Sequence, residues 1–150
     1  MLVPERYAAE IVACAAEGWQ FIDLKRFIFY LDRHESQRLF EQGTLDPAAV
    51  ATVVQNLQGG SIAAVRDAYF QVGGFDEEFV GWGGEDNDFW DRAATTGRTW
   101  RFGFLPIVHL FHAPQPGKLQ GSDAPAIRRY RELERIPAEE RIRRLTAQHR

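Results

Sequence analysis

Apolar and polar residues follow one another in short segments that predict alternating helices and strands. The segments with the composition and end signals of helices are 4–19, 66–74, 85–97 and 126–147. The segments rich in aromatic and β-branched residues, predicted to be strands, are 26–31, 59–65 and 99–112. Loose alternation of the two kinds, without an internal repeat, is typical of an α/β fold.

Proline and glycine set the predicted boundaries. Pro4 suits a first helical turn and Gly18 ends that helix. Pro106 interrupts the last predicted strand, and Pro137 interrupts the C-terminal helix. Residues 32–56 are polar and then weakly helical, and the middle of this segment is predicted to be a mobile loop or excursion.

Composition indicates one ordinary globular domain. The chain has 150 residues, of which 45% are hydrophobic and 26% charged, and a chain of this size buries roughly 70% of its unfolded surface. No apolar run approaches the ~20 residues of a membrane span, and no signal peptide opens the chain. The one cysteine, Cys14, excludes an internal disulfide and is predicted to lie in the core. The expected location is the cytoplasm.

Charge is divided unevenly along the chain. Residues 128–150 contain eight Arg and four Glu, or +4, whereas the remaining 127 residues contain ten basic and seventeen acidic side chains, or −7. The acidic body argues against a nucleic-acid partner. In the basic segment arginines alternate with glutamates, which predicts a solvated amphipathic helix rather than a phosphate or membrane patch.

The densest polar cluster is GGFDEEFVGWGGEDNDFW, residues 73–90. Glu85 and Asp86 open a predicted helix, where the helix dipole favours carboxylates, and the two preceding glycines let a ligand come close. Trp82 offers a flat apolar face with one N–H donor, which suits the C–H face of a sugar ring. The pattern fits a helix cap with surface acids, a site for a polyhydroxylated ligand, or a metal loop.

Two histidines, His109 and His112, stand three residues apart at the end of the last predicted strand. In a strand their side chains point to opposite faces, so one ion cannot easily hold both unless the chain bends. A single histidine at a strand end is either a ligand for Mn²⁺ or a similar ion, or a hydrogen-bonded structural residue. The Asp-x-Asp spelled by residues 86–88 begins a helix, whereas the metal–diphosphate motif of sugar transferases ends a strand; we interpret it as a coincidence.

The string GGSIAAVRDAYFQVGGFDEEFVGWGGEDNDFWDR, residues 59–92, precedes a segment that ends in His-x-x-His. This order of residues resembles the C-terminal half of GT-A glycosyltransferases. It is most similar to the β-1,4-galactosyltransferase group and related bacterial family-2-type enzymes, with polypeptide N-acetylgalactosaminyltransferases further off. The resemblance runs from about residue 1 to residue 115.

The resemblance implies a role for each matching residue. Asp86 matches the catalytic base that takes a proton from the acceptor hydroxyl, and Glu85 matches an acceptor-binding carboxylate. Asn87 stands where the galactosyltransferases have a further Asp, so its acceptor contact departs from the family. The other matches are Trp82 at the donor–acceptor junction, Gly83 and Gly84 in the mobile loop beside it, Gly59 and Gly60 before the strand beneath the acceptor, His112 as a metal ligand, and His109 as a weaker one.

The resemblance also implies parts that the chain does not show. In the family, an N-terminal half that ends in Asp-x-Asp binds the nucleotide, and the first residues here resemble the segment after that motif. The expected fold is therefore the acceptor-side, C-terminal portion of an α/β GT-A domain over 1–125, without the nucleotide-binding strands, plus an arginine-rich helical tail over 126–150. Such a portion would expose a sheet edge and bind Mn²⁺ and nucleotide sugar weakly or not at all on its own.

The expected function is transfer of a sugar from a nucleotide-sugar donor to a glycan hydroxyl, with inversion and with Mn²⁺ as the metal of the complete enzyme. Two alternatives are a non-catalytic carbohydrate-binding or interaction module and an inactive fragment.

Overall fold

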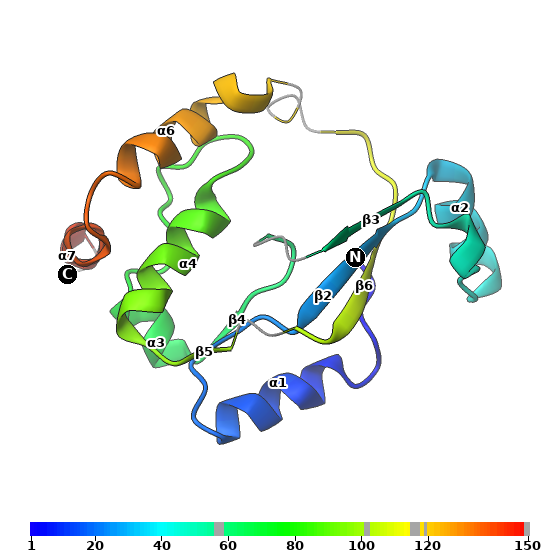
Figure 1. The fold of residues 1–150 in the computed structure, drawn as a ribbon, viewed down its shortest axis with the longest axis horizontal. Helices are drawn as coiled ribbons and strands as arrows, with labels where there is room; N and C mark the ends of the chain where they lie inside the picture. Colours follow the sequence, from blue (N-terminus) through cyan, green and yellow to red (C-terminus); the bar gives the residue numbers. More distant parts are fainter. Residues whose placement is uncertain (56–58, 101–102, 115–117, 119, 149–150) are drawn as a thin grey trace.

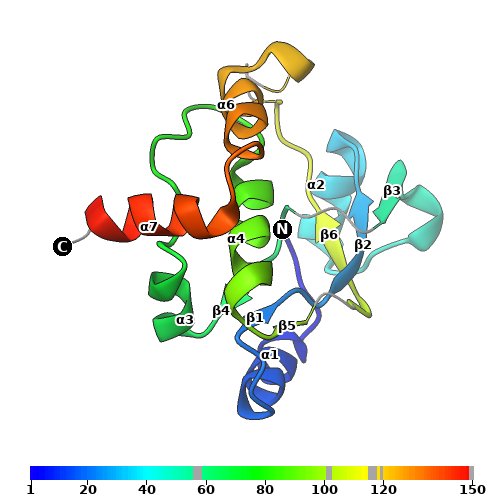
Figure 2. The same ribbon diagram turned by 60° about the vertical axis from the view of Figure 1, so that its left-hand side comes forward.

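The computed structural model describes residues 1–55, 59–100, 103–114, 118 and 120–148, and it has a mixed α/β architecture. The strands are β1 Phe21–Ile22, β2 Lys25–Tyr30, β3 Thr52–Gln55, β4 Ala63–Ala64, β5 Thr99–Trp100 and β6 Leu105–His109. The α-helices are α1 Tyr7–Ala16, α2 Arg33–Gln42, α3 Arg66–Gln71, α4 Glu85–Thr96, α6 Pro125–Leu133 and α7 Ala138–Gln148. Figure 1 shows α3, α4, α6 and α7 on one side of the strands and α2 at the opposite end, and Figure 2 shows the same separation.

The strands form two small sheets, and the strands of the two sheets interleave along the chain. One sheet has the order β4-β1-β5 and the other β3-β2-β6. In each sheet the middle strand has one antiparallel neighbour and one parallel neighbour, β5 or β6. Because parallel neighbours need a long crossover, the chain between β1 and β5 contains helices α3 and α4. The edge of β6 is bridged at Val108 by Leu2.

The pairing of β2 with β6 contains one irregularity, and it determines where Lys25 points. Lys25 pairs with Leu105, but the next pair is Phe27 with Pro106, so Arg26 is the extra residue. Proline has no N–H to donate and is tolerated at such a position. The extra residue brings Lys25 and Ile28 to the same side of β2, and both are only 3% exposed.

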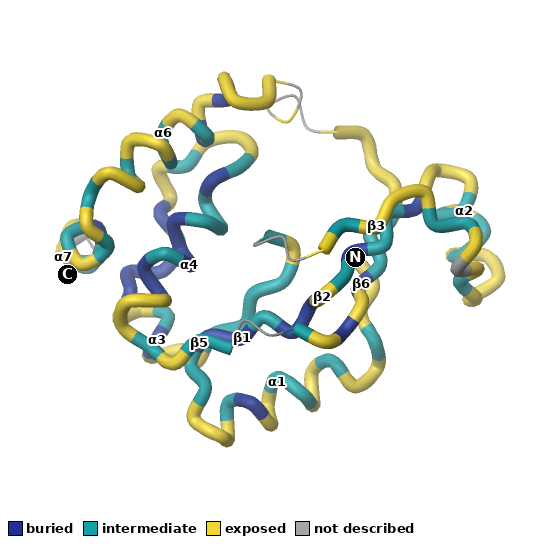
Figure 3. The backbone as a smooth tube through the Cα atoms, in the orientation of Figure 1, coloured by how far each residue is buried: buried dark blue, intermediate teal, exposed yellow. Residues whose placement is uncertain are grey.

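The core lies where α4 crosses the first sheet. Phe89, Trp90 and Ala93 of α4 pack with Phe21 of β1 and with residues of α3. A second cluster joins Cys14 of α1 to Ile22, Leu24 and Leu105, which confirms that Cys14 belongs to the core. Figure 3 shows the buried positions concentrated in α4 and in the segment around β1.

The segment 32–56, whose middle was predicted to be a loop, contains a helix and a strand on either side of that middle, α2 and β3. Helix α2 begins where the Asp32 side chain accepts a hydrogen bond of 2.8 Å from the backbone N–H of Glu35. It ends at Gly43, whose φ of 70° is left-handed. Strand β3 then pairs with β2. The Asp-x-x-Glu spacing is a capping signal that the sequence contains, whereas β3 depends on a partner strand.

The predicted strand 99–112 is wrong as one element. Its described part divides into β5 and β6, which belong to different sheets, and β6 ends at His109. Residues 101–102 lie outside the described residues. The predicted strand 59–65 is likewise reduced to β4, because its glycines serve a cavity wall instead of a sheet.

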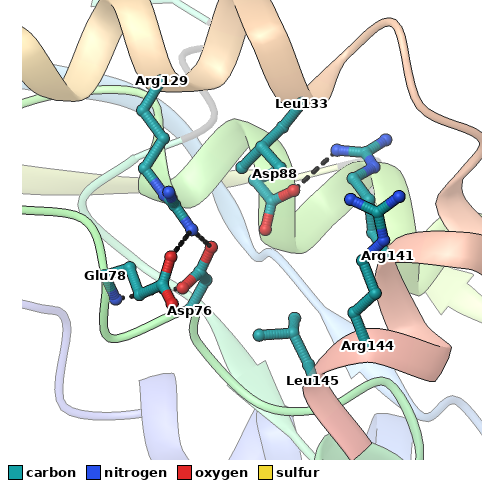
Figure 4. Close-up of a pocket in the computed structure, with 8 residues that line it drawn as sticks. All are labelled: Asp76, Glu78, Asp88, Arg129, Leu133, Arg141, Arg144 and Leu145. Carbon is teal, nitrogen blue, oxygen red and sulfur yellow. Dashed lines mark hydrogen bonds and ion pairs between the residues drawn. The ribbon is translucent and has the colours of Figure 1, made fainter.

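The C-terminal segment consists of two helices, α6 and α7, that separate near Pro137 as predicted. The prediction that this segment is solvated holds for Arg144 but is wrong for Arg141, which is 5% exposed and bonded to Asp88 of α4. Figure 4 shows how arginines of both helices reach acids below them. Among the described helices, none is long and apolar enough to span a bilayer.

Candidate functional site

A cavity of about 470 Å³ lies at the N-terminal end of α4, beside the C-terminal end of β6. All ten residues that the resemblance indicated line this cavity. These are Gly59, Gly60, Trp82, Gly83, Gly84, Glu85, Asp86, Asn87, His109 and His112. The sequence separates them by up to 53 positions, so their meeting in one cavity depends on the fold.

Five further residues line the same cavity, and the sequence did not single them out. They are Met1, Ile28, Tyr30, Lys118 and Ile127. Ile28 and Tyr30 are two positions apart in β2 and therefore lie on the same face of that strand. Nothing in the sequence indicated Ile127, because it comes from α6.

Gly59 allows the Asp86 carboxylate to occupy its place in the cavity wall. A Cβ atom at residue 59 would lie 2.4 Å from Asp86 Oδ2, closer than two such atoms can approach. The glycine is therefore required for packing, although its φ is not in the left-handed region. Asp86 itself is held by the first turn of α4, where the helix dipole favours a carboxylate.

The pKa of Asp86 is unusually high for an aspartate. Burial, and then repulsion from Glu85, raise the pKa of Asp86 from 3.8 to about 6. Lys25 acts in the opposite direction, and Asp23 adds to the rise. A carboxylate with a pKa of about 6 is ionised at neutral pH and is still basic enough to take a proton from a hydroxyl in a transition state.

The raised pKa predicts how Asp86 titrates. We expect the side-chain carboxyl carbon of Asp86, followed by NMR and identified with Asp86→Asn, to have a midpoint of about 6. Any reaction that uses Asp86 as a base loses rate as the pH falls below that midpoint, by about tenfold for each pH unit. A midpoint near 3.8, the ordinary value, would contradict the burial and repulsion described here.

Glu85 presents a hydrogen-bond acceptor to the cavity. Its Oε2 atom is buried and has no hydrogen-bond partner among the described residues. Because a buried carboxylate oxygen without a donor is costly, a hydroxyl group from a ligand would stabilise this arrangement. Asn87, on the same turn, adds an amide with both donors and acceptors to the lining.

Trp82 stands at the exposed end of the cavity on a loop built from glycines. The Trp82 residue is 38% exposed. Gly81 and Gly83 beside it have φ values of 99° and 100°, which L side chains rarely adopt. The Nζ atom of Lys118 lies 5.6 Å from the centre of the indole ring. The loop therefore exposes an aromatic surface beside the carboxylates of α4.

The two histidines are close together, contrary to the expectation for a continuous strand. Because β6 ends at His109, the chain bends before His112, and the two Nε2 atoms are 3.4 Å apart. The His109 ring stacks on Tyr30 with 4.6 Å between ring centres. Desolvation lowers the pKa of His109, against a backbone hydrogen bond at Leu110 that raises it, and the neighbouring positive groups lower it further, so the neutral form is favoured.

These imidazoles form at most part of a metal site. His112 Nδ1 lies 2.9 Å from the carbonyl oxygen of Ala113, and when it donates there, Nε2 is left as the free acceptor. In the described part of the chain, no group of three or more His, Cys, Asp or Glu side chains is placed to hold a metal ion. A hard divalent ion takes about six ligands, most of them oxygen. The described residues do not by themselves fit Mn²⁺.

The Asp-x-Asp letters at 86–88 do not form one site. Asp86 lines the cavity, whereas Asp88 is 1% exposed and pairs with Arg92 of the same helix and with Arg141 of α7. The two carboxylates therefore have separate surroundings, in agreement with the interpretation of this spelling as a coincidence.

Comparison with known proteins gives partial matches. Residues 44–113 match the family model described as the N-terminal domain of galactosyltransferase. Chondroitin synthase of Escherichia coli is 38% identical over 68 residues, which are 45% of this chain and 10% of that protein. A probable N-acetylgalactosaminyltransferase 9 of Caenorhabditis elegans is 38% identical over 68 residues, 43% of this chain and 11% of that protein. No solved structure matches the chain.

The matched region contains the whole set of predicted site residues, since they lie between residues 59 and 112. The match spans only about a tenth of the length of the two curated relatives. The description of the family model does not confirm the position in a C-terminal half that the resemblance implies. Together, the family match and the two named transferases support a glycosyltransferase family for this chain.

Proposed function

We propose that the cavity is the acceptor side of a glycosyltransferase active site of the GT-A, galactosyltransferase-like kind. The observation that carries this proposal is the meeting of a basic carboxylate, an acceptor carboxylate and an exposed indole in one cavity. The reaction is the transfer of a sugar from a nucleotide-sugar donor to a hydroxyl of a glycan. Both relatives are named as enzymes of this general kind.

In the proposed reaction Asp86 takes the proton of the acceptor hydroxyl. The acceptor oxygen forms a bond to the anomeric carbon while the bond from that carbon to the nucleotide diphosphate breaks, and the diphosphate leaves with the electron pair. Attack from the face opposite the leaving group inverts the configuration. Glu85 and Asn87 bind the other acceptor hydroxyls, and Trp82 contacts the sugar ring. General-base assistance of this kind contributes ~10²–10⁴-fold.

The metal assignment remains a proposal for a complete enzyme. His112, with His109 as the weaker ligand, would offer nitrogen atoms to Mn²⁺. The remaining ligands would come from a nucleotide-binding half, as the resemblance implies. When bound, such an ion neutralises charge on a departing diphosphate. The proton transfer to Asp86 does not require it.

The proposal is tested by acceptor binding, which needs neither donor nor metal. Saturation-transfer NMR with a panel of hexoses and N-acetylhexosamines, in the presence of EDTA, would identify the sugar that binds. Trp82→Ala is expected to weaken its binding about tenfold, or ~1.4 kcal/mol, because the apolar face of the ring loses its partner.

Phe70→Ala is the matched control for this measurement. Phe70 is an aromatic residue of α3 that is 55% exposed and does not line the cavity, so its removal should leave sugar binding unchanged. Equal affinities for wild type and Trp82→Ala would refute the role of the indole. Sugar binding with no transfer from any nucleotide sugar in the intact protein would support the carbohydrate-binding alternative.

A further inference from the structure

The loop that carries Trp82 has little internal support. Within the described part of the chain, residues 80–83 make no backbone-to-backbone hydrogen bond. Gly81, Gly83 and Gly84 all have left-handed φ values, near 94–100°. A segment of this composition has many accessible conformations when it is isolated. The position of the Trp82 indole must therefore be set by neighbouring elements.

Helix α6 is in direct contact with this loop. A Cβ atom at residue 83 would lie 2.6 Å from Ile127 Cδ1, and one at residue 84 would lie 2.6 Å from Tyr130 Cβ and 3.2 Å from the carbonyl oxygen of Ala126. Because Gly83 and Gly84 have no Cβ atom, helix α6 can pack directly against the backbone of the loop. Figures 1 and 2 both show α6 running beside the segment that leads into α4.

Arg129 of α6 holds the residues just before the loop. Its Nη2 atom is 2.7 Å from Asp76 Oδ2 and 2.5 Å from Glu78 Oε2, as Figure 4 shows. Its guanidinium also lies 5.5 Å from the centre of the Phe79 ring. Asp76 is 7% exposed and accepts a hydrogen bond from the backbone N–H of Glu78. The side chain of Arg129 therefore contacts three of the four residues from 76 to 79.

Helix α6 is itself fixed on α4, the helix that carries the cavity carboxylates. The Tyr130 hydroxyl lies 3.1 Å from Asp91 Oδ2, and Ala124 and Ala126 are buried at the contact. Ile127, on the same helix, lines the cavity. The helix therefore connects the Trp82 loop to the element that presents Asp86.

We propose that α6 sets the position of the Trp82 indole relative to Asp86, with Arg129 as the positioning residue. The claim that this position matters for sugar transfer rests on the proposed function. The claim that α6 sets the position rests only on the contacts between α6 and the loop. Arg129 is not among the residues that line the cavity, and its side chain contacts Asp76, Glu78 and Phe79.

Fluorine NMR of the 5-fluorotryptophan-labelled chain tests this proposal. The chain has four tryptophans, and Trp82→Phe identifies the Trp82 signal. In Arg129→Gln we expect the Trp82 signal to move by more than its linewidth, while the signals of Trp19, Trp90 and Trp100 stay in place. Arg129→Lys should return it part of the way. An unmoved Trp82 signal in Arg129→Gln would overturn the proposal.

Arg131→Gln is the matched control, since Arg131 is an exposed residue of the same helix and its change should move no signal. If Arg129→Gln unfolds the chain, all four signals collapse together, and Glu78→Gln then decides. Glu78 has a side chain that is 60% exposed, so this variant keeps the fold and should move the Trp82 signal in the same direction; an unmoved signal overturns the proposal. The measurement uses no sugar, so a failure to bind sugar would refute the proposed function alone.

Discussion

Asp86→Asn is expected to lower sugar transfer by at least ~10²-fold while the fold and sugar binding persist. Asparagine keeps the size of the side chain but cannot accept a proton from the acceptor hydroxyl, and general bases of this kind supply ~10²–10⁴-fold. The rate is to be measured with the full chain, a nucleotide-sugar donor and a glycan acceptor. Asp67→Asn is the matched control, because Asp67 is an exposed acid of α3 outside the cavity.

The same substitution has an expected effect on stability whose sign follows from the pKa. In the folded state the pKa of Asp86 is about 6, above its ordinary value of 3.8, so between these values the folded state binds more protons than the unfolded state. The stability of the wild type therefore falls as the pH rises through this window. Asp86→Asn has no carboxyl group at this position, so it does not lose stability in this way. It should therefore be more stable than the wild type between pH 4 and pH 7. Unchanged transfer in Asp86→Asn would refute its role as the base, whatever the stability measurement gives.

Asp88→Ala is expected to cost the fold ~3–5 kcal/mol, a large part of the stability of a domain of this size. Asp88 Oδ2 is 2.8 Å from Arg92 Nη2 and its Oδ1 is 2.6 Å from Arg141 Nη1. The side chains of Arg92 and Arg141 are 0% and 6% exposed, so the substitution leaves the buried Arg92 without its carboxylate and Arg141 with only the more distant Asp91, at 3.5 Å. Urea denaturation, with the midpoint and slope compared to wild type, measures the loss.

Glu140→Ala gives the comparison for that measurement. Glu140 also contacts two arginines, Arg143 and Arg144, but these are 75% and 57% exposed. Exposed pairs contribute ~0.2–1 kcal/mol, so this variant should remain close to wild type. Equal losses in the two variants would mean that the burial of Asp88 is not what makes it important.

The sequence was most informative where a local signal decides the structure. Helix α4 begins after Gly84 and ends at Gly97, as the acids of its first turn and the glycines predicted. Eight of the cavity residues were indicated by their order in the string 59–92, and the two histidines by the segment that follows it, both of which can be read without the fold. The α/β class followed from the alternation of segments. These features can be predicted from the local sequence alone.

The features that the sequence did not predict depend on distant partners. Strands β1, β4 and β5 have two residues each, too few to show a period. The burial of Arg141 is decided by Asp88, 53 residues away. The contact of the two histidines depends on a bend after β6, and the burial of Lys25 on one extra residue in β2. None of these has a signal within its own segment.

Asp86 and Asp88 are two positions apart on α4, so the helical turn directs them about 200° from each other. Arg141 of α7 binds Asp88 from outside α4, so together with the core packing of α4 it helps to fix the rotation of this helix about its own axis, and with it the direction of the catalytic candidate. Shortening the chain before α7 would delete Arg141 and remove this constraint on the rotation. Activity in such a shortened protein would then fall although no atom of the cavity had been altered.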